Sequence, residues 1–186
     1  NASQIGRTPL GSLTGATNGQ VLSWTSSTGM WIPQTASGGT SYTFQFSNPI
    51  AIGTGSGQTG QQINSVAIGA NAGQTKQGTG AIAIGFQAGQ GTQGTGSIAI
   101  GNGAGSIRQN SNTIAIGPGA GQNAQSTNSV AIGAGAGQTN QDNDSISIGY
   151  NAGNYHQYQY NLAIGSGAGQ TNQGSLVGRC IAIGLS

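Results

Sequence analysis

The chain of 186 residues contains few of the side chains that carry out chemistry. It has no glutamate, one histidine (His156), one cysteine (Cys180) and two aspartates, Asp142 and Asp144. An acid–base pair, a nucleophile triad or a zinc ligand set cannot be assembled from so few groups within one chain. The sequence therefore predicts a protein that is not an enzyme, with no catalytic residue, no cofactor and no metal ion.

Charge is equally scarce, at 3% of the residues, and the net charge is only +2. The four cations are scattered along the chain: Arg7, Lys76, Arg108 and Arg179. They form no basic patch of the kind that binds nucleic acid, so no nucleic-acid partner is expected. There is also no long apolar run and no signal peptide, so membrane insertion is not expected either. The start at Asn1 and an end without a polar cap predict a piece of a longer protein.

Glycine, in contrast, is abundant and periodic. The 37 glycines and the many polar residues would by themselves suggest a disordered chain. However, one glycine returns with a constant 16-residue period and without a slip, which is typical of stacked identical units. These glycines are Gly53, Gly69, Gly85, Gly101, Gly117, Gly133, Gly149 and Gly165.

Each of these glycines closes a short strand-like motif of an aliphatic residue, a small residue and isoleucine. In unit four, for example, the motif is Ile98-Ala99-Ile100-Gly101, and Ser147 is the only exception to alanine at the small position. This spacing predicts a strand with one buried face that ends at a turn. We assign the two aliphatic side chains of each unit to the interior, because they are the most hydrophobic.

Two further positions recur in all eight units. A second glycine follows the first by four positions, and a glutamine follows it by eight, as in Gly105 and Gln109. The residues before this glutamine include Lys76, Arg108 and His156, which favour contact with water. By strand alternation the glutamine points inward or into a subunit contact, where its copies can hydrogen-bond in a column. The alternative is a surface glutamine retained after recent duplication.

A 16-residue repeat is too short for a helical repeat and fits one rung of a β-solenoid. We therefore predict an all-β fold, a parallel β-roll of eight to nine rungs over residues 50–186, preceded by a small β-hairpin region. The last Ile-Ala-Ile-Gly motif ends at Gly184, which follows Gly165 by three positions more than the period. We expect residues 174–179 to form a loop there, and Ile181 and Ile183 to rejoin the isoleucine columns.

The first 49 residues follow a different pattern. Residues 21–24 and 30–33 each contain a tryptophan and are separated by a polar, glycine-containing turn, which predicts a β-hairpin within an attachment segment of residues 1–37. Alternating aromatics predict that residues 38–49 form a strand that caps the roll. So short a segment cannot bury two tryptophans alone. Trp24 and Trp31 are therefore candidate oligomer contacts.

Unit seven holds four of the five tyrosines of the chain. Exposed tyrosines offer contact area and a hydroxyl group at a small entropy cost, so they often mark a binding surface. The alternative is local packing of the rings over a loosely filled rung. The candidate partner-contact residues are Tyr150, Tyr155, His156, Tyr158 and Tyr160.

The repeat unit Asn64-Ser65-Val66-Ala67-Ile68-Gly69, with its seven relatives, resembles the head repeats of YadA-type trimeric adhesins. Those repeats are usually slightly shorter per turn than the repeat of this chain. The longer form, as in Ala136-Gly137-Gln138-Thr139-Asn140-Gln141, is more similar to repeat proteins of large DNA viruses and phages. Residues 19–24 and 31–33 also resemble short hairpin modules of viral and phage fibres. The adhesin resemblance implies a left-handed parallel β-roll and a homotrimer, and the fibre resemblance implies a virion surface.

A roll with so thin a core is expected to be marginal alone, which favours association through its alanine-rich faces. The expected function is a structural or adhesive segment of a trimeric surface fibre or spike on a virion or elsewhere outside the cell. Its partners would be further fibre segments, other virion proteins and a host-surface receptor. A bacterial autotransporter adhesin head, on the bacterial outer surface, is one alternative. An ice-binding β-solenoid and a functional amyloid-like polymer are alternatives of other classes.

Overall fold

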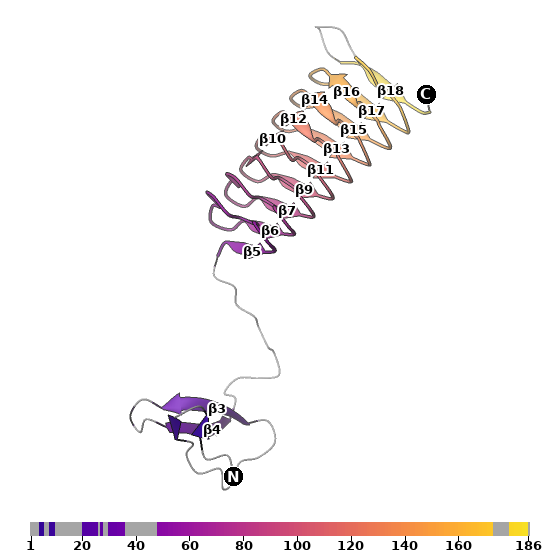
Figure 1. Ribbon diagram of the computed structural model, residues 1–186. Coiled ribbons are helices and arrows are strands. Elements are labelled where there is room, and N and C mark those ends of the chain that lie inside the picture. Colours follow the sequence, from indigo (N-terminus) through magenta and orange to yellow (C-terminus); the bar gives the residue numbers. More distant parts are fainter. Residues whose placement is uncertain are drawn as a thin grey trace. The chain divides into compact units, whose positions relative to one another are not determined.

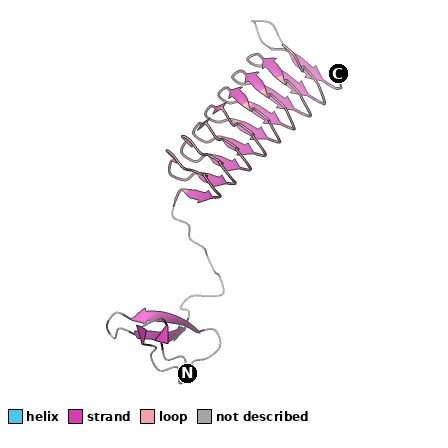
Figure 2. Ribbon diagram, viewed as in Figure 1, coloured by secondary structure: helices cyan, strands magenta, loops and turns pink. Residues whose placement is uncertain are grey.

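The repeats form a stack of rungs in which each rung places one short strand above the equivalent strand of the rung before it (Figure 1). The computed structural model describes residues 4–5, 8–9, 20–25, 27, 30–35, 48–172 and 179–185. By its contacts the chain divides into two units, residues 1–45 and 46–186. The described parts contain strands and turns but no helix (Figure 2).

The larger sheet of the roll has nine parallel strands. Each consists of the aliphatic–small–aliphatic motif and pairs in register with the same motif of the next rung, so that Ile114, Ala115 and Ile116 of β11 lie beside Val130, Ala131 and Ile132 of β13. The strands are β5 (Ile50–Ile52), β6 (Val66–Ile68), β7 (Ile82–Ile84), β9 (Ile98–Ile100), β11 (Ile114–Ile116), β13 (Val130–Ile132), β15 (Ile146–Ile148), β17 (Leu162–Ile164) and β18 (Ile181–Ile183).

A second parallel sheet is built from the segments around the recurring glutamine. Its five strands are β8 (Thr92–Gln93), β10 (Arg108–Gln109), β12 (Asn123–Gln125), β14 (Thr139–Gln141) and β16 (Tyr155–Gln157). Isolated bridges extend the same pairing toward both ends, between Thr59 and Thr75 and between Tyr155 and Thr171. The predicted parallel β-roll with one rung per repeat unit is confirmed.

The last strand confirms the ninth rung. Ile164 of β17 pairs with Ile183 of β18, although the interval between them is longer than the regular period. The expected loop falls largely on residues 173–178, which lie outside the described residues, as does most of the predicted capping strand at residues 38–49.

The N-terminal unit contains the predicted hairpin. Strands β3 (Gln20–Thr25) and β4 (Met30–Thr35) are antiparallel, and their register pairs the backbone of Trp24 with that of Trp31. A shorter antiparallel pair, β1 (Gln4–Ile5) and β2 (Thr8–Pro9), precedes it.

The core of the roll differs from the sequence prediction. The small residue of each strand points inward, and Ala67 to Ala163 in this column are fully buried. The flanking aliphatic residues point outward: Ile84 and Ile148 are each 36% exposed, and Ile52 is 43% exposed. The assignment of the isoleucines to the interior, and of the alanine faces to a contact between chains, was wrong. The interior is too thin for isoleucine, because the glutamines of the facing sheet occupy it.

The recurring glutamine lies inside the roll, as strand alternation predicted. Its Nε2 donates a hydrogen bond across the core to the main-chain carbonyl of the first residue of the facing strand, at 2.7 Å from Gln109 to Ile98 and 2.8 Å from Gln125 to Ile114. The glutamines of the later rungs also bond to one another, for example Gln125 Nε2 to Gln141 Oε1 at 3.3 Å. Each glutamine thus joins the two sheets, which face each other across the core.

The two recurring glycines have separate structural causes. Gly101 has a φ of +126°, and a Cβ there would lie 2.8 Å from the carbonyl carbon of Gly117 in the next rung. Gly121 has a φ of +51°, and a Cβ there would lie 2.5 Å from Oε1 of Gln125 and 3.3 Å from Cβ of Ala115. The first glycine therefore allows rungs to stack closely, and the second leaves room for the buried glutamine.

Candidate functional site

Two surfaces of the roll stand out, and the larger is the outer side of the nine-stranded sheet. We call it the aliphatic face, because each strand presents two aliphatic side chains on it, while the alanine or serine between them points into the core. At one rung per about 4.8 Å, nine strands make a stripe roughly 40 Å long. Contiguous apolar patches on a protein surface often mark interaction sites.

No charged residue occurs in these nine strands. Among the described residues of the roll, Lys76, Arg108, Asp142 and Asp144 lie in the second sheet or in the turns, and Arg179 precedes β18. The aliphatic face can therefore be covered without burying a charge, whose desolvation would oppose association.

The second surface is the aromatic cluster of unit seven. Tyr155, His156 and Tyr158 come together, with the imidazole of His156 centred 4.6 Å from the Tyr155 ring and 6.4 Å from the Tyr158 ring. Tyr150 and Tyr160 are exposed, at 62% and 52%, on the turns that precede and follow this group. Of the five candidate residues, Tyr155, His156 and Tyr158 thus have their rings close together, and the role of all five as a partner contact stays a prediction.

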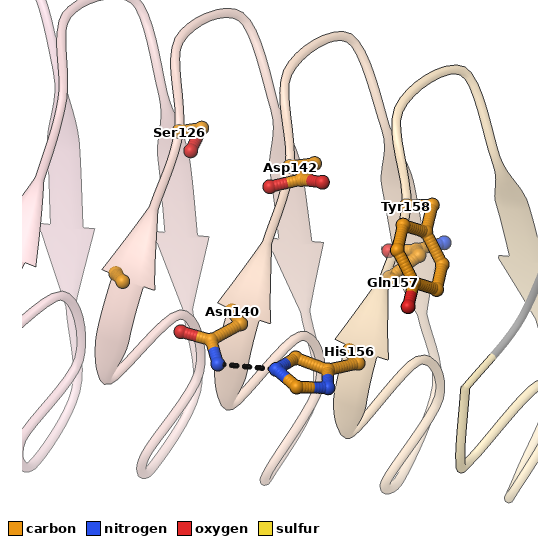
Figure 3. A pocket seen from close by; sticks show the side chains of 7 residues that line it. Ser126, Asn140, Asp142, His156, Gln157 and Tyr158 are labelled. Atoms are coloured by element: carbon orange, nitrogen blue, oxygen red, sulfur yellow. Dashed lines mark hydrogen bonds between the residues drawn. The ribbon is translucent and has the colours of Figure 1, made fainter. Parts of the chain in front are cut away.

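A hollow of about 230 Å³ opens beside His156 and Tyr158. Apart from Gln157, its other lining residues come from the two preceding rungs, and Figure 3 shows the lining as two rows that run along the stack. We call this site the aromatic hollow. One row consists of Ala124, Asn140 and His156, and the other of Ser126, Asp142 and Tyr158, with the buried Gln157 beneath.

The register explains why these residues meet. Members of each row are one repeat apart, so they occupy the same position in β12, β14 and β16 or directly after these strands. Short side chains at Ala124 and Ser126 leave space, while His156 and Tyr158 form a wall two rungs away. Asn140 links the rungs, since its Nδ2 lies 2.6 Å from Nε2 of His156.

Sequence reasoning identified His156 and Tyr158 but missed Ser126, Asn140 and Asp142. The signal was present in the register, because one period added to position 126 gives position 142 and a second gives position 158. The same arithmetic leads from 124 to 140 and 156. Asp142 is exposed, and its main-chain N–H bonds to the carbonyl of Gln157 at 2.9 Å, which fixes its backbone beside the rung of His156 and Tyr158.

The candidate oligomer contacts Trp24 and Trp31 are placed only by their backbones, which are directly paired across β3 and β4. No conclusion about their contacts follows, and their role stays a prediction.

Comparisons of the chain with protein-family models, with curated proteins and with solved structures found no match. Among the described residues, no three of histidine, cysteine, aspartate and glutamate are grouped so that they could hold a metal ion. The same part of the chain contains no helix of the length and apolarity that crossing a membrane would require. The interpretation of function therefore rests on the two surfaces described above.

Proposed function

We propose that this protein is a non-enzymatic structural and adhesive segment of a homotrimeric surface fibre or spike. The observation that carries the proposal is the aliphatic face, an uncharged apolar stripe that runs along the whole roll. Its side chains point outward and are half-buried or exposed in the single chain, because the interior holds only small residues and glutamine. Burial of such a stripe is the main source of free energy for association of proteins.

The best-fitting occupant of the aliphatic face is a second copy of the same chain. A partner that covers the stripe must present apolar groups at the same axial spacing of about 4.8 Å over the same length. Another copy of this roll meets both conditions, and identical rows can interdigitate rung by rung. A net charge of only +2 per chain offers little electrostatic resistance to this contact.

The number three and the location come from the resemblance to adhesin heads and viral fibre modules. We place the segment on a virion surface, with a bacterial outer surface as the alternative. In either setting the hairpin of β3 and β4 joins the roll to further fibre segments or other surface proteins, and the aromatic hollow stays available for attachment to a host surface.

The proposal is tested by placing two positive charges on the aliphatic face. The variant Ile100→Lys/Ile116→Lys should raise the dissociation constant of the assembly by orders of magnitude, since each buried, unpaired charge costs several kcal/mol. The matched control, Thr75→Lys/Thr92→Lys, adds the same charge at exposed positions around the second sheet. Analytical ultracentrifugation of the full chain measures both.

We expect the native protein and the control to sediment as trimers, and the isoleucine variant to sediment as chains of 18.2 kDa that keep their β-sheet circular dichroism. Equal sedimentation of the two variants would exclude the aliphatic face as the contact surface.

A further inference from the structure

The aromatic hollow is not needed for stacking of the rungs, since the other rungs stack without it. In earlier rungs the same positions hold Lys76 with Gly78, Thr92 with Gly94 and Arg108 with Asn110. A hollow of about 530 Å³ also lies over the first two of these rungs, so the aromatic hollow differs in its side chains rather than in being hollow. Only from Ala124 onward do the rows combine short side chains, amide and carboxylate groups, and then two rings. This local change of side chains along the two rows indicates a site with its own binding chemistry.

We propose that the aromatic hollow binds a neutral carbohydrate, with one sugar ring of a surface glycan held between the two rows. The inference rests on the proposed attachment role of the segment and names the chemical class of its partner. The hollow, at about 230 Å³, is smaller than the roughly 300–1,000 Å³ of pockets for drug-sized ligands, which suits a single ring.

The polar groups of the hollow match neighbouring hydroxyl groups, which both donate and accept hydrogen bonds. The carboxylate of Asp142 is an acceptor with two oxygens, so it can take hydrogen bonds from two adjacent hydroxyls. The Asn140 amide and the Ser126 and Tyr158 hydroxyls each supply a donor and an acceptor. Asp142 and Asn140 are exposed, so these groups are available to a ligand.

The rings supply the apolar part of the contact. His156 and Tyr158 are half-buried, and their ring centres lie 6.4 Å apart, one ring at the end of each row. The faces of aromatic rings carry partial negative charge and attract the polarised C–H groups on one side of a sugar ring. The hollow thus combines aromatic surface with polar groups that can hydrogen-bond to sugar hydroxyls. This combination favours a carbohydrate over a purely apolar ligand.

Other ligand classes fit the hollow less well. Lysine and arginine are absent from its lining residues, and Arg108 lies one rung beyond Ala124, outside the hollow, so a phosphate or sulfate group would have no cationic partner among the lining residues. Asp142 is the single carboxylate, which is too few for a calcium ion. A peptide adding as a strand needs unpaired main-chain groups, but the N–H groups of Ser126 and Asp142 bond to the next rung at 2.8 and 2.9 Å.

The hollow also stays open in the proposed trimer. It lies on the outer side of the second sheet, while the aliphatic face is the outer side of the sheet across the core. A trimer therefore presents three copies of the hollow, and three weak contacts on a glycan-covered surface reinforce one another.

The experiment is saturation-transfer NMR on the full native chain with four soluble probes at millimolar concentration: maltotriose, cellotriose, mannotriose and chitotriose. We expect transfer to at least one of these trisaccharides. Tyr158→Ala should weaken that binding about tenfold or more, because it removes a ring of the wall. Asp142→Ala should weaken it too, and this variant keeps the fold because the side chain is exposed and the N–H bond to Gln157 is retained.

Tyr150→Ala is the matched control, since it removes an exposed tyrosine of the same rung that does not line the hollow. Its binding should equal that of the native chain. The inference is overturned if none of the four probes shows transfer, or if the binding survives both Tyr158→Ala and Asp142→Ala unchanged.

Light scattering on the same samples separates this inference from the proposed function. If the protein is a trimer that binds no probe, the proposed carbohydrate site is wrong and the proposed fibre segment is retained. If the protein is a monomer that binds a probe through Tyr158 and Asp142, the proposed carbohydrate site is supported and the proposed trimer is wrong.

Discussion

At the scale of single residues, the buried glutamine determines which residues its neighbours can be. Gln125 donates to the carbonyl of Ile114 at 2.8 Å, and its Oε1 lies 2.5 Å from the point where a Cβ of residue 121 would be. Ala115 lies on the other side of that point, with its Cβ 3.3 Å away. A glycine at position 121 and an alanine at position 115 are therefore consequences of an amide that spans the core.

This packing predicts unequal costs for two glycine substitutions. Gly80 and Gly121 both have positive φ, +66° and +51°, so alanine costs about 1–2 kcal/mol of backbone strain at each. At Gly121 the new methyl group also displaces the Gln125 amide and weakens its bond to Ile114, which adds about 1–3 kcal/mol. At Gly80 nothing lies within 4 Å of the new Cβ. Thermal unfolding followed by circular dichroism should show a clearly larger loss for Gly121→Ala than for Gly80→Ala, and equal losses would contradict the packing.

At the scale of the strand, the inward position is a tightly filled site. Ala115→Val in β11 should destabilise the roll by about 1–3 kcal/mol through overpacking, although valine is the better strand former. Ala51→Val is the matched control, because Ala51 occupies the same column but is exposed in the end rung. The control should change stability by less than about 0.5 kcal/mol. If Ala115→Val stabilised the protein, the alanines would face outward.

Period and strand positions could be predicted from sequence because they depend only on spacing. Which side of the strand faces inward could not be predicted from hydrophobicity alone. A strand with its isoleucines inward and a strand with its alanine inward show the same alternation of side chains. The thickness of the interior decides between these two orientations. The repeat did contain a signal: the inner position accepts only alanine or serine, whereas the first outer position varies among isoleucine, valine and leucine.

The candidate site was predictable in part for a related reason. An excess of tyrosine in unit seven indicated His156 and Tyr158. The composition of a single unit does not show which residues of other units lie beside them. The hollow is built across three rungs, so Ser126 and Asp142 enter it only when the repeat register is converted into rows along the stack. Tyr150 and Tyr160, which share the unit, lie on its turns instead.

At the scale of the whole molecule, the two sheets of the roll have separate tasks in the proposed function. The nine-stranded sheet presents the aliphatic face to other copies, and the five-stranded sheet carries the aromatic hollow. Glutamine side chains connect the two sheets through the core. Assembly and attachment are therefore expected to be separable by mutation, with Ile100 and Ile116 affecting one and Tyr158 the other.

The central claim, that the aliphatic face is covered by two further copies of the chain, is tested most directly by the mass of the native protein in solution. Multi-angle light scattering at micromolar concentration should give three times 18.2 kDa, about 55 kDa, in a single symmetric peak. A monodisperse species of 18.2 kDa would contradict the account, and so would open-ended polymers without a defined mass.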